Sequence, residues 1–560
     1  MLFCLFYLHF AYKIGSEHQL IVGSIRSYHR PIPYDYANKN LFCSEKNSGI
    51  LHQKFGDVII GEVRMVSPYK FSLGNKIVRS QLCSKRYDDT QKAQLRLLID
   101  NDYHYNFEFD NISCISYENE QRKIGARIGF KKDNKYYLYT ELNFLLHLSS
   151  LTGEAEVRGF DLLSLKEPVD IDSKDINFTY SILFDDLVDN TNARDKRYIE
   201  SEVPKKSSLL VICSIVVSVL IIIFMVYFIT KSENNTMDTD FDEYNGYEWK
   251  LIHGDVCRAP NKQSRLSALI GWGSQLALTF ILVLIQGILD KIKLNVVSSL
   301  VKGFLVSFLI SAPFGGFISG KLFKTIGSKG WKSMAFFSSL MLTSISSVLI
   351  LILKIRLSLN SSSVMLPFKS ILLFISCNFI LYFIGTLIGL RGKGFELSQK
   401  VNQLPRQIPP QNTFFVVFIN ILGGCFIFIS ILLYCKVFFN LIWKFSNISF
   451  DIYHLLLNII LLFLQSATVG IISSYYLLNK EDYRWWWNSF KSGFFVGIFY
   501  IIYLIYYCIN YYVPSDKDSL LIYIVVNMMG CFGLSIVCGT FSFIGSFFFI
   551  QKIYNSLKVE

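Results

Sequence analysis

The chain has 560 residues and a net charge of +12, and it is 52% hydrophobic but only 18% charged. Soluble domains carry roughly 25% charged residues, so a wholly soluble chain is excluded. Nucleic-acid binding is not indicated either, because Lys and Arg lie largely at the ends of apolar runs and no basic stripe with interleaved aromatics occurs. Residues 17–205 are mixed in composition and 207–551 form long apolar runs, which predicts a soluble N-terminal domain followed by a polytopic membrane domain.

The chain opens with the apolar stretch 2–12, followed by Lys13 and small residues. This stretch is too short to span a bilayer and has the length of a secretory apolar core, so residues 1–15 are predicted to be a signal peptide that ends near Gly15. The basic residues that usually precede such a core are missing. An uncleaved anchor or a truncated gene start is therefore the alternative.

Residues 16–207 are predicted to form an all-β, β-sandwich-like lumenal domain. Stretches with apolar and polar residues in alternation indicate strands, for example within 56–66, 135–148 and 176–186. Turn residues separate them, namely Ser67-Pro68, Gly74-Asn75 and Lys132-Asp133-Asn134.

A lumenal domain lies in an oxidising compartment, which permits disulfides. Of its three cysteines, Cys43 and Cys83 are the preferred pair and Cys114 is left over; three buried free thiols are the alternative. Asn111 and Asn177 each begin an Asn-x-Ser/Thr glycosylation sequon on the side that is predicted to be lumenal.

The apolar part of the chain predicts nine transmembrane helices, each of about 20 residues or more. Residues 208–230 form the first helix, 231–265 a cytosolic loop, 266–551 a bundle of eight helices and 552–560 a cytosolic tail. The nine spans are expected near 208–230, 266–289, 299–320, 333–353, 369–390, 413–435, 450–478, 493–513 and 519–550.

Nine crossings from a lumenal N-terminal domain place the C-terminus in the cytosol. On this scheme the cytosolic segments carry 18 Lys and Arg residues, whereas the lumenal loops after the first span carry nine. This twofold bias is that of the positive-inside rule.

Three consecutive tryptophans, Trp485, Trp486 and Trp487, begin the expected eighth span. Indole combines an apolar body with a polar N–H and settles at the headgroup level of a bilayer. The three residues are therefore predicted to be an interfacial anchor, with a surface that grips a partner or a lipid as the alternative.

His253 and Asp255 lie in the loop before the second span. One His with one Asp makes a poor metal site, so these two residues are expected to order the loop through hydrogen bonds to the backbone. No metal site, cofactor or catalytic residue is predicted for this chain.

Glycines recur within the predicted spans, and small residues let helix backbones approach closely. Gly315 and Gly316 belong to the third span, and six more lie further along the chain: Gly423, Gly424, Gly530, Gly533, Gly539 and Gly545. Packing within the protein is the simplest interpretation of this pattern.

Several motifs occur in the order found in a known family. They are GDVIIGEVRMVSPY at 56–69, FDNIS at 109–113, VRGFDL at 157–162, EWKLIHGDVCR at 248–258, Gly271-x-Gly273-x-Gln275, NQLPRQIPPQ at 402–411, EDYRWWWNSFKSG at 481–493 and the final stretch at 539–558. Together they resemble the nonaspanins, the transmembrane 9 superfamily, over nearly the whole chain.

The chain departs from that family at its intramembrane acids. The family usually carries a Glu in each of the sixth and seventh spans, whereas this chain has no acid from Gly423 to Tyr434 and only Gln465 in the seventh span. Intramembrane carboxylates are costly and usually functional. Their absence lowers the expectation of ion-coupled activity and leaves a role based on packing intact.

The resemblance implies a non-enzymatic multi-pass protein of Golgi and endosomal membranes that assists the sorting of other membrane proteins. The intramembrane glycines would then recognise transmembrane helices of client proteins. Lys558 and Glu560 resemble the family's terminal Lys-x-acid signal, which the COPI coat reads. An ion or small-solute transporter or channel is the alternative function.

Overall fold

The computed structural model describes most of the chain. It covers residues 12–27, 34, 36–37, 40–44, 64–110, 112–118, 121–151, 154–173, 175–186, 215–224, 226–227, 248–289, 297–327, 330–341, 365–395, 401–443, 452–511 and 517–556. Two compact units make up the protein. One comprises 1–203 with 440–449 and 514–519, and the other comprises the remaining residues.

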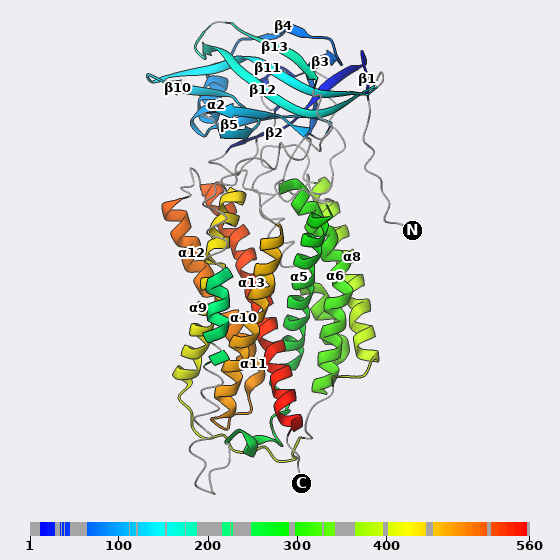
Figure 1. Cartoon of the computed structure of the whole chain (residues 1–560), viewed down its shortest axis with the longest axis vertical. Coiled ribbons are helices and arrows are strands. Elements are labelled where there is room, and N and C mark those ends of the chain that lie inside the picture. Colours follow the sequence, from blue (N-terminus) through cyan, green and yellow to red (C-terminus); the bar gives the residue numbers. More distant parts are fainter. Residues whose placement is uncertain are drawn as a thin grey trace. The chain divides into compact units, whose positions relative to one another are not determined.

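The N-terminal unit contains two β-sheets (Figure 1). The larger has the order β4-β13-β11-β12-β7-β8, with β1 paired to β12 and β10 to β11, and the smaller has the order β3-β2-β5-β6, with β9 paired to β5. The strands are β1 Tyr12–Lys13, β2 Glu17–Ser27, β3 Met65–Ser72, β4 Ile77–Lys85, β5 Tyr103–Phe109, β6 Ile112–Ser113, β7 Ile115–Glu118, β8 Gln121–Ile124, β9 Ala126–Arg127, β10 Gly129–Lys132, β11 Lys135–Leu151, β12 Glu154–Asp170 and β13 Ile176–Asp186.

One hydrophobic core is shared by the two sheets. Alternate residues of β11 turn into it, because successive side chains of a strand point to opposite faces. Phe144 of β11 lies 5.1 Å, ring to ring, from Phe107 of the smaller sheet, and Tyr69 of β3 lies 5.2 Å from Tyr180 of β13. The β-rich domain that the sequence predicts is thus present.

Two local predictions for this unit are corrected by the structure. Ser67-Pro68, expected as a turn, lies inside β3, where Ser67 donates a hydrogen bond to the Leu20 carbonyl. The domain also begins before Gly15, because Tyr12 pairs with Ala155 and its ring packs 5.8 Å from Phe109. Residues 1–11 lie outside the described part of the chain, so the signal peptide stays a prediction.

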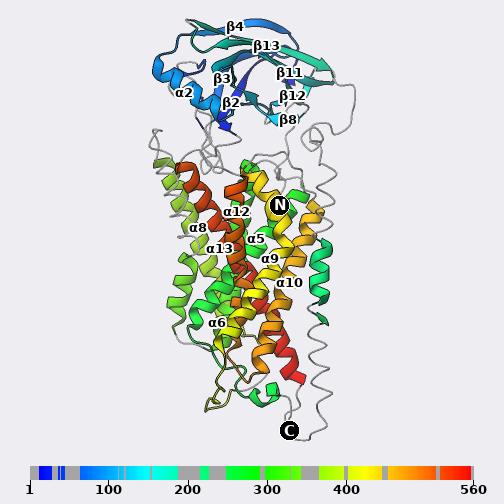
Figure 2. The ribbon, with the colours of Figure 1, turned by 90° about the vertical axis from the view of Figure 1, so that its left-hand side faces the viewer.

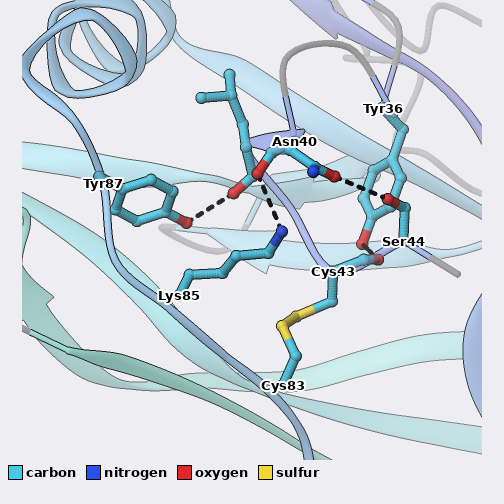
Figure 3. Close-up of a disulfide and its surroundings, with 8 residues drawn as sticks. Tyr36, Asn40, Cys43, Ser44, Cys83, Lys85 and Tyr87 are labelled. Atoms are coloured by element: carbon cyan, nitrogen blue, oxygen red, sulfur yellow. Dashed lines mark hydrogen bonds between the residues drawn. A yellow bond between two sulfur atoms is a disulfide. The ribbon is translucent and has the colours of Figure 1, made fainter. Parts of the chain in front are cut away.

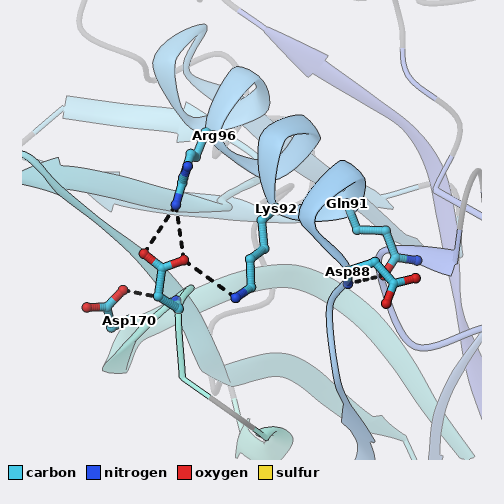
Figure 4. A network of polar contacts seen from close by, with 6 residues as sticks. Asp88, Gln91, Lys92, Arg96 and Asp170 are labelled. Carbon is cyan, nitrogen blue, oxygen red and sulfur yellow. Dashed lines mark hydrogen bonds and ion pairs between the residues drawn. The ribbon is translucent and has the colours of Figure 1, made fainter.

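A helix that the alternation of apolar residues did not predict, α2 (Asp89–Asp100), joins β4 to β5. It buries only a narrow face, and two of its half-buried cations contact the turn after β12 (Figure 4). Arg96 donates to the Asp172 carboxylate at 3.0 Å, and Lys92 lies 3.6 Å from the same group. These ion pairs are exposed, so the buried leucines of α2 contribute most of its stability.

The disulfide of this unit joins Cys43 to Cys83 of β4 (Figure 3). The two Cα atoms are 6.0 Å apart, within the range of about 4.4–6.8 Å usual for disulfides. Around it, Tyr36 donates to the Cys43 carbonyl and Tyr87 donates to the Leu41 carbonyl. The bridge therefore attaches an irregular segment to the edge strand of the larger sheet. Cys114 is a buried free thiol, and burial raises its pKa well above the usual value.

Loss of the disulfide should destabilise the β-rich unit measurably. Replacing both cysteines with serine removes the cross-link of a 40-residue loop, and the entropy of such a loop predicts a loss of roughly 4 kcal/mol in the free energy of unfolding. Pulse proteolysis of the full chain in urea, followed with an N-terminal epitope, measures it. Dithiothreitol should weaken the native protein and leave the variant unchanged; equal sensitivity in both would contradict the assignment.

The second unit is helical (Figures 1 and 2). Its helices are α5 Gln263–Ile288, α6 Val297–Ile326, α8 Met365–Arg391, α9 Thr413–Trp443, α10 Ile452–Leu478, α11 Trp485–Phe494, α12 Val496–Asn510 and α13 Lys517–Ser556, and the 3-10 helix η2 spans Glu248–Ile252. Seven helical stretches among the described residues are long and apolar enough to cross a bilayer, with α11 and α12 counted as one.

The two spans that complete the predicted nine are described only in part. Residues 215–224 form a shorter apolar helix within the first predicted span, and 331–341 are helical at the start of the fourth. Two boundaries differ from prediction: α13 continues through the expected tail to Ser556, and α5 begins at Gln263 within the expected loop. Apolar counting misses such ends because polar residues can extend a helix beyond the hydrocarbon layer.

Candidate functional site

Three loops that are far apart in the sequence meet at one end of the helical unit. They are residues 248–262 before α5, 401–412 before α9 and 479–487 at the start of α11, and together they are called the loop platform below. Each carries one of the family-like motifs. Hydrogen bonds between the loops, rather than regular secondary structure, hold the platform together.

Asp255 lies at the centre of the platform and is 3% exposed. Its carboxylate accepts a hydrogen bond from Arg258 Nε at 2.9 Å and from the backbone N–H of Arg406 at 3.3 Å. Arg258 in turn donates to the Asn402 carbonyl at 2.9 Å. A buried carboxylate is costly unless it is paired and hydrogen-bonded, so Asp255 stabilises the platform only while the first two loops stay together.

Gly254 shows how closely these two loops approach. The Asn402 backbone N–H donates to the Gly254 carbonyl at 2.9 Å, and a Cβ at position 254 would overlap the Asn402 side-chain amide. A larger residue at position 254 would therefore have to displace that amide from its place between the loops.

Arg406 joins the second loop to both others. Its guanidinium donates to the Leu251 carbonyl at 2.9 Å and to the Glu481 carboxylate at 2.7 Å. Gln411 adds a second link, because its amide donates to the Lys480 carbonyl at 2.7 Å. The loop 401–412 is thereby tied to its neighbours at both of its ends.

The tryptophans are part of this platform. Trp485 and Trp486 are each 2% exposed, stack with ring centroids 4.3 Å apart, and pack against Phe543 of α13. The Trp485 indole donates to the Val256 carbonyl at 2.8 Å. The half-buried Trp487 donates to the Asn261 carbonyl at 2.7 Å.

Protein encloses Trp485 and Trp486, and the predicted interfacial anchor stays a prediction. The Trp485 N–H bonds to the first loop and both rings pack against α13, which sequence spacing could not indicate. The Trp486 N–H is buried without a hydrogen-bond partner among the described residues. Trp487 is the one of the three with substantial exposure, and its role as an interfacial anchor stays a prediction.

His253 and Asp482 order the loops locally. The exposed His253 bonds through Nδ1 to the Lys250 carbonyl at 3.0 Å. Asp482 is buried and accepts from the backbone and the guanidinium of Arg484, an interaction that raises the pKa of Arg484. Among the described residues, no group of three or more His, Cys, Asp or Glu side chains is placed to hold a metal ion.

Most of the glycines singled out within the spans contact other helices of the same chain. An added Cβ at Gly424 would lie 2.7 Å from the Phe495 backbone, at Gly539 3.0 Å from Phe490, and at Gly545 2.7 Å from Ala467. Gly423 faces Val469 at 2.5 Å. These four residues allow close contact among α9, α10, α11 and α13, as small residues do in membrane bundles.

Gly530 and Gly533 differ from the other four. At Gly530 the nearest atom to an added Cβ is the Tyr500 hydroxyl at 3.4 Å, and at Gly533 it is a Leu276 methyl at 4.0 Å. Gly530 is exposed and Gly533 half-buried. Within the part of the chain that the structure describes, no backbone atom lies within 4 Å of either added Cβ, so both positions are open to a further side chain or helix.

Two buried polar clusters within the helices were not predicted. Asn420, Ser473 and Asn488 close a ring of hydrogen bonds of 2.6–2.8 Å across α9, α10 and α11. Gln275 of α5 donates to Asn378 of α8 at 3.0 Å and to the Phe308 carbonyl of α6. Only the Gly-x-Gly-x-Gln motif pointed toward the second cluster.

The structure describes some of the remaining predicted site residues, and others lie outside its described part. Asn177 lies exposed on β13, where its side chain is accessible, and its glycosylation stays a prediction. Asn111, Lys558 and Glu560 lie outside the described residues. Gly315 and Gly316 pack against Gln275 and the Tyr382 carbonyl.

Comparison with known proteins identifies the family of this chain. Residues 33–516 match the family model described as Endomembrane protein 70, which is most of the chain. The chain belongs to the transmembrane 9 superfamily, the nonaspanins. It is 25% identical to the mouse Transmembrane 9 superfamily member 2 over 97% of this chain and 92% of the relative.

Similar relatives occur in plants and in other branches of the superfamily. The chain is 26% identical to member 5 of Arabidopsis thaliana, over 98% of this chain and 95% of the relative. It is 24% identical to human member 4, over 94% and 92%. The apolar helices and this membership together make the chain an integral, multi-pass membrane protein.

Removal of the Arg406 side chain should loosen all three loops of the platform. Arg406→Ala deletes the donors to Leu251 and Glu481, and charged hydrogen bonds of this kind contribute roughly 1–3 kcal/mol. Hydrogen–deuterium exchange of the purified full chain should become about tenfold faster in 248–258 and 479–487.

Arg484→Ala is the matched control, since Arg484 is largely exposed and pairs only within its own turn among the described contacts. Its effect should be confined to 482–485. Equal, widespread acceleration in both variants, or none in Arg406→Ala, would contradict the proposed role of Arg406.

Proposed function

We propose that this nonaspanin is a non-enzymatic protein of Golgi and endosomal membranes that assists the sorting and localisation of other membrane proteins by binding their transmembrane helices. Family membership supports the membrane setting. The observation that carries the proposed mechanism is the open backbone at Gly530 and Gly533 of α13.

The contrast among the glycines limits where a client helix could bind. Gly423, Gly424, Gly539 and Gly545 are occupied by the protein's own helices, so they serve its internal packing. A client helix with small residues could approach α13 closely only where the backbone is open. That condition is met around Gly530 and Gly533, with Leu276 of α5 and Tyr500 of α12 as the nearest side chains.

The β-rich unit is proposed to be lumenal, with a β-sandwich formed by its two sheets. Its shared core and its disulfide support this placement, because disulfides persist in oxidising compartments. The loop platform would then lie on the cytosolic side, together with the tail that carries Lys558 and Glu560 and is proposed to bind the COPI coat.

A transporter or channel is the second candidate, and the buried Gln275–Asn378 pair favours it. Gln275 Oε1 is buried and has no hydrogen-bond partner among the described residues, whereas Gln275 Nε2 donates to both Phe308 and Asn378. Polar groups inside a membrane domain can mark a solute path. Against this candidate, α9 and α10 contain no Asp or Glu.

Bulky side chains at the open glycines should block client binding. In the variant Gly530→Leu/Gly533→Leu, no backbone atom lies near the added Cβ atoms, so the fold should persist while a second helix is kept at a distance. The probe is a single-span reporter whose helix contains Gly-x-x-x-Gly, with a Leu-substituted reporter beside it. The surface level of the Gly-x-x-x-Gly reporter should fall several-fold in cells that carry the variant. The surface level of the Leu-substituted reporter should not change.

Met528→Phe is the matched control, because it adds bulk on another side of α13, about 200° around the helix from Gly530. It should leave the reporter at its normal level. Deletion of the whole protein separates the two candidate functions: changed solute uptake with unchanged reporter levels would reject helix binding and favour transport.

The tail makes an independent prediction. Replacing Lys558 and Glu560 with alanine should move the protein from the Golgi to later compartments, since the terminal charges would no longer pair with the coat. Fluorescence microscopy of the tagged chain measures the shift, with Lys552→Ala as a control cation upstream. Unchanged localisation would reject the coat signal and leave helix binding untouched.

A further inference from the structure

The loop 401–412 is held firmly although it has no helix or strand. Asn402 and Arg406 attach it to the first loop of the platform, and Arg406 and Gln411 attach it to the third. All of these contacts are made on its inner side. The loop is therefore ordered by the platform before any partner arrives.

Its prolines determine the shape of this loop. Pro405, Pro409 and Pro410 restrict their own φ to about −65°, and each also disfavours helical geometry in the residue before it. Leu404 and Ile408 are such preceding residues. The backbone from 404 to 410 is thus biased to the polyproline II conformation, which has three residues per turn.

Two half-buried residues mark the side of the loop that faces the protein. Between 404 and 412 only Ile408 and Gln411 are half-buried, and they are three residues apart; the other seven residues are exposed. In a polyproline II segment these two residues lie on one edge, which faces the protein. Leu404, Gln407 and Pro410, also three apart, then form an outward edge.

Leu404 is 84% exposed at the start of the outward edge. A single exposed leucine is common, but this one lies at a bend immediately before Pro405, in a loop that hydrogen bonds hold in place. Its neighbours Asn402, Gln403 and Gln407 are polar, which is unlike a segment that inserts into lipid. The composition favours a protein partner over the membrane.

Local charge indicates the chemistry of that partner. The nearby acids Asp255, Glu481 and Asp482 are engaged by arginines of the platform. Lys480, whose carbonyl accepts the bond from Gln411, presents an exposed cation beside the end of the loop. A complementary surface would therefore place acidic residues near Lys480.

We propose that residues 401–412 are a pre-ordered docking ligand for a cytosolic protein domain with an aromatic-lined groove for polyproline II segments and an acidic rim. Such grooves take the apolar and proline side chains of one edge, and a segment that is already extended loses little entropy on binding. Here the edge is Leu404, Gln407 and Pro410. This surface is distinct from the helix-binding face of α13. The inference rests on the proposed cytosolic placement of the loop platform and not on the proposed helix binding.

The test uses the full chain in lipid nanodiscs and a panel of purified SH3, WW and EVH1 domains, with PDZ domains, which lack such a groove, as the background. At least one aromatic-groove domain should bind above that background with a Kd of about 1–100 µM. Leu404→Ala/Pro410→Ala should weaken this binding at least tenfold, whereas Leu251→Ala, an exposed leucine elsewhere on the platform, should leave it unchanged.

Both variants change exposed side chains, so the fold should be retained and its melting temperature provides the check. Binding by none of the groove domains at 100 µM would overturn the proposal. It would also be overturned if the double variant bound the groove domains as well as the native chain does.

Discussion

The loop platform depends on the hydrogen bonds that the buried Asp255 carboxylate accepts from Arg258 and from the Arg406 backbone. This carboxylate lies where two loops meet, and removal of either partner would leave a charge without compensation in a protein interior. Because one partner is a backbone N–H of the second loop, the contact specifies the position of that loop and not merely its proximity. Arg406, Trp485 and Trp487 then extend the same constraint to the third loop.

The loop platform thus forms an ordered end of the helical unit, although most of its residues lie outside regular secondary structure. The indoles contribute in two ways: the rings of Trp485 and Trp486 pack against α13, and the N–H groups of Trp485 and Trp487 donate to carbonyls of the first loop. Since the loops precede α5, α9 and α11, the platform sets where these three helices begin. The Asn420–Ser473–Asn488 ring joins α9, α10 and α11 further along by the same means, with neutral groups in place of charges.

Within the helical unit, small residues have two different uses. Where an added Cβ would overlap another backbone, as at Gly424 and Gly545, glycine is a requirement of packing. Where the surroundings are open, as at Gly530, contacts with the described residues give no reason for glycine, and the proposed client binding is placed there. The same distinction between satisfied and outward-facing groups separates the inner edge of 401–412 from Leu404 and Pro410.

The sequence by itself determined the features that depend on composition and local period. Apolar runs predicted most of the spans, two-residue alternation predicted β11 and β13, and compartment chemistry suggested the Cys43–Cys83 pair. Spacing of turn residues was less informative, as Ser67-Pro68 within β3 shows, because proline is tolerated in a strand where its missing N–H is not needed.

Only the tertiary structure decided which distant groups meet. The motifs around Asp255, Arg406 and Trp485 were visible separately, but the contacts among them join residues more than 70 positions apart, and no local rule encodes such pairs. The same holds for the glycines: their sequence context is alike in all six cases, whereas the presence or absence of a facing helix is a property of the folded chain. Long-range packing, not local preference, therefore decides which of them can serve function.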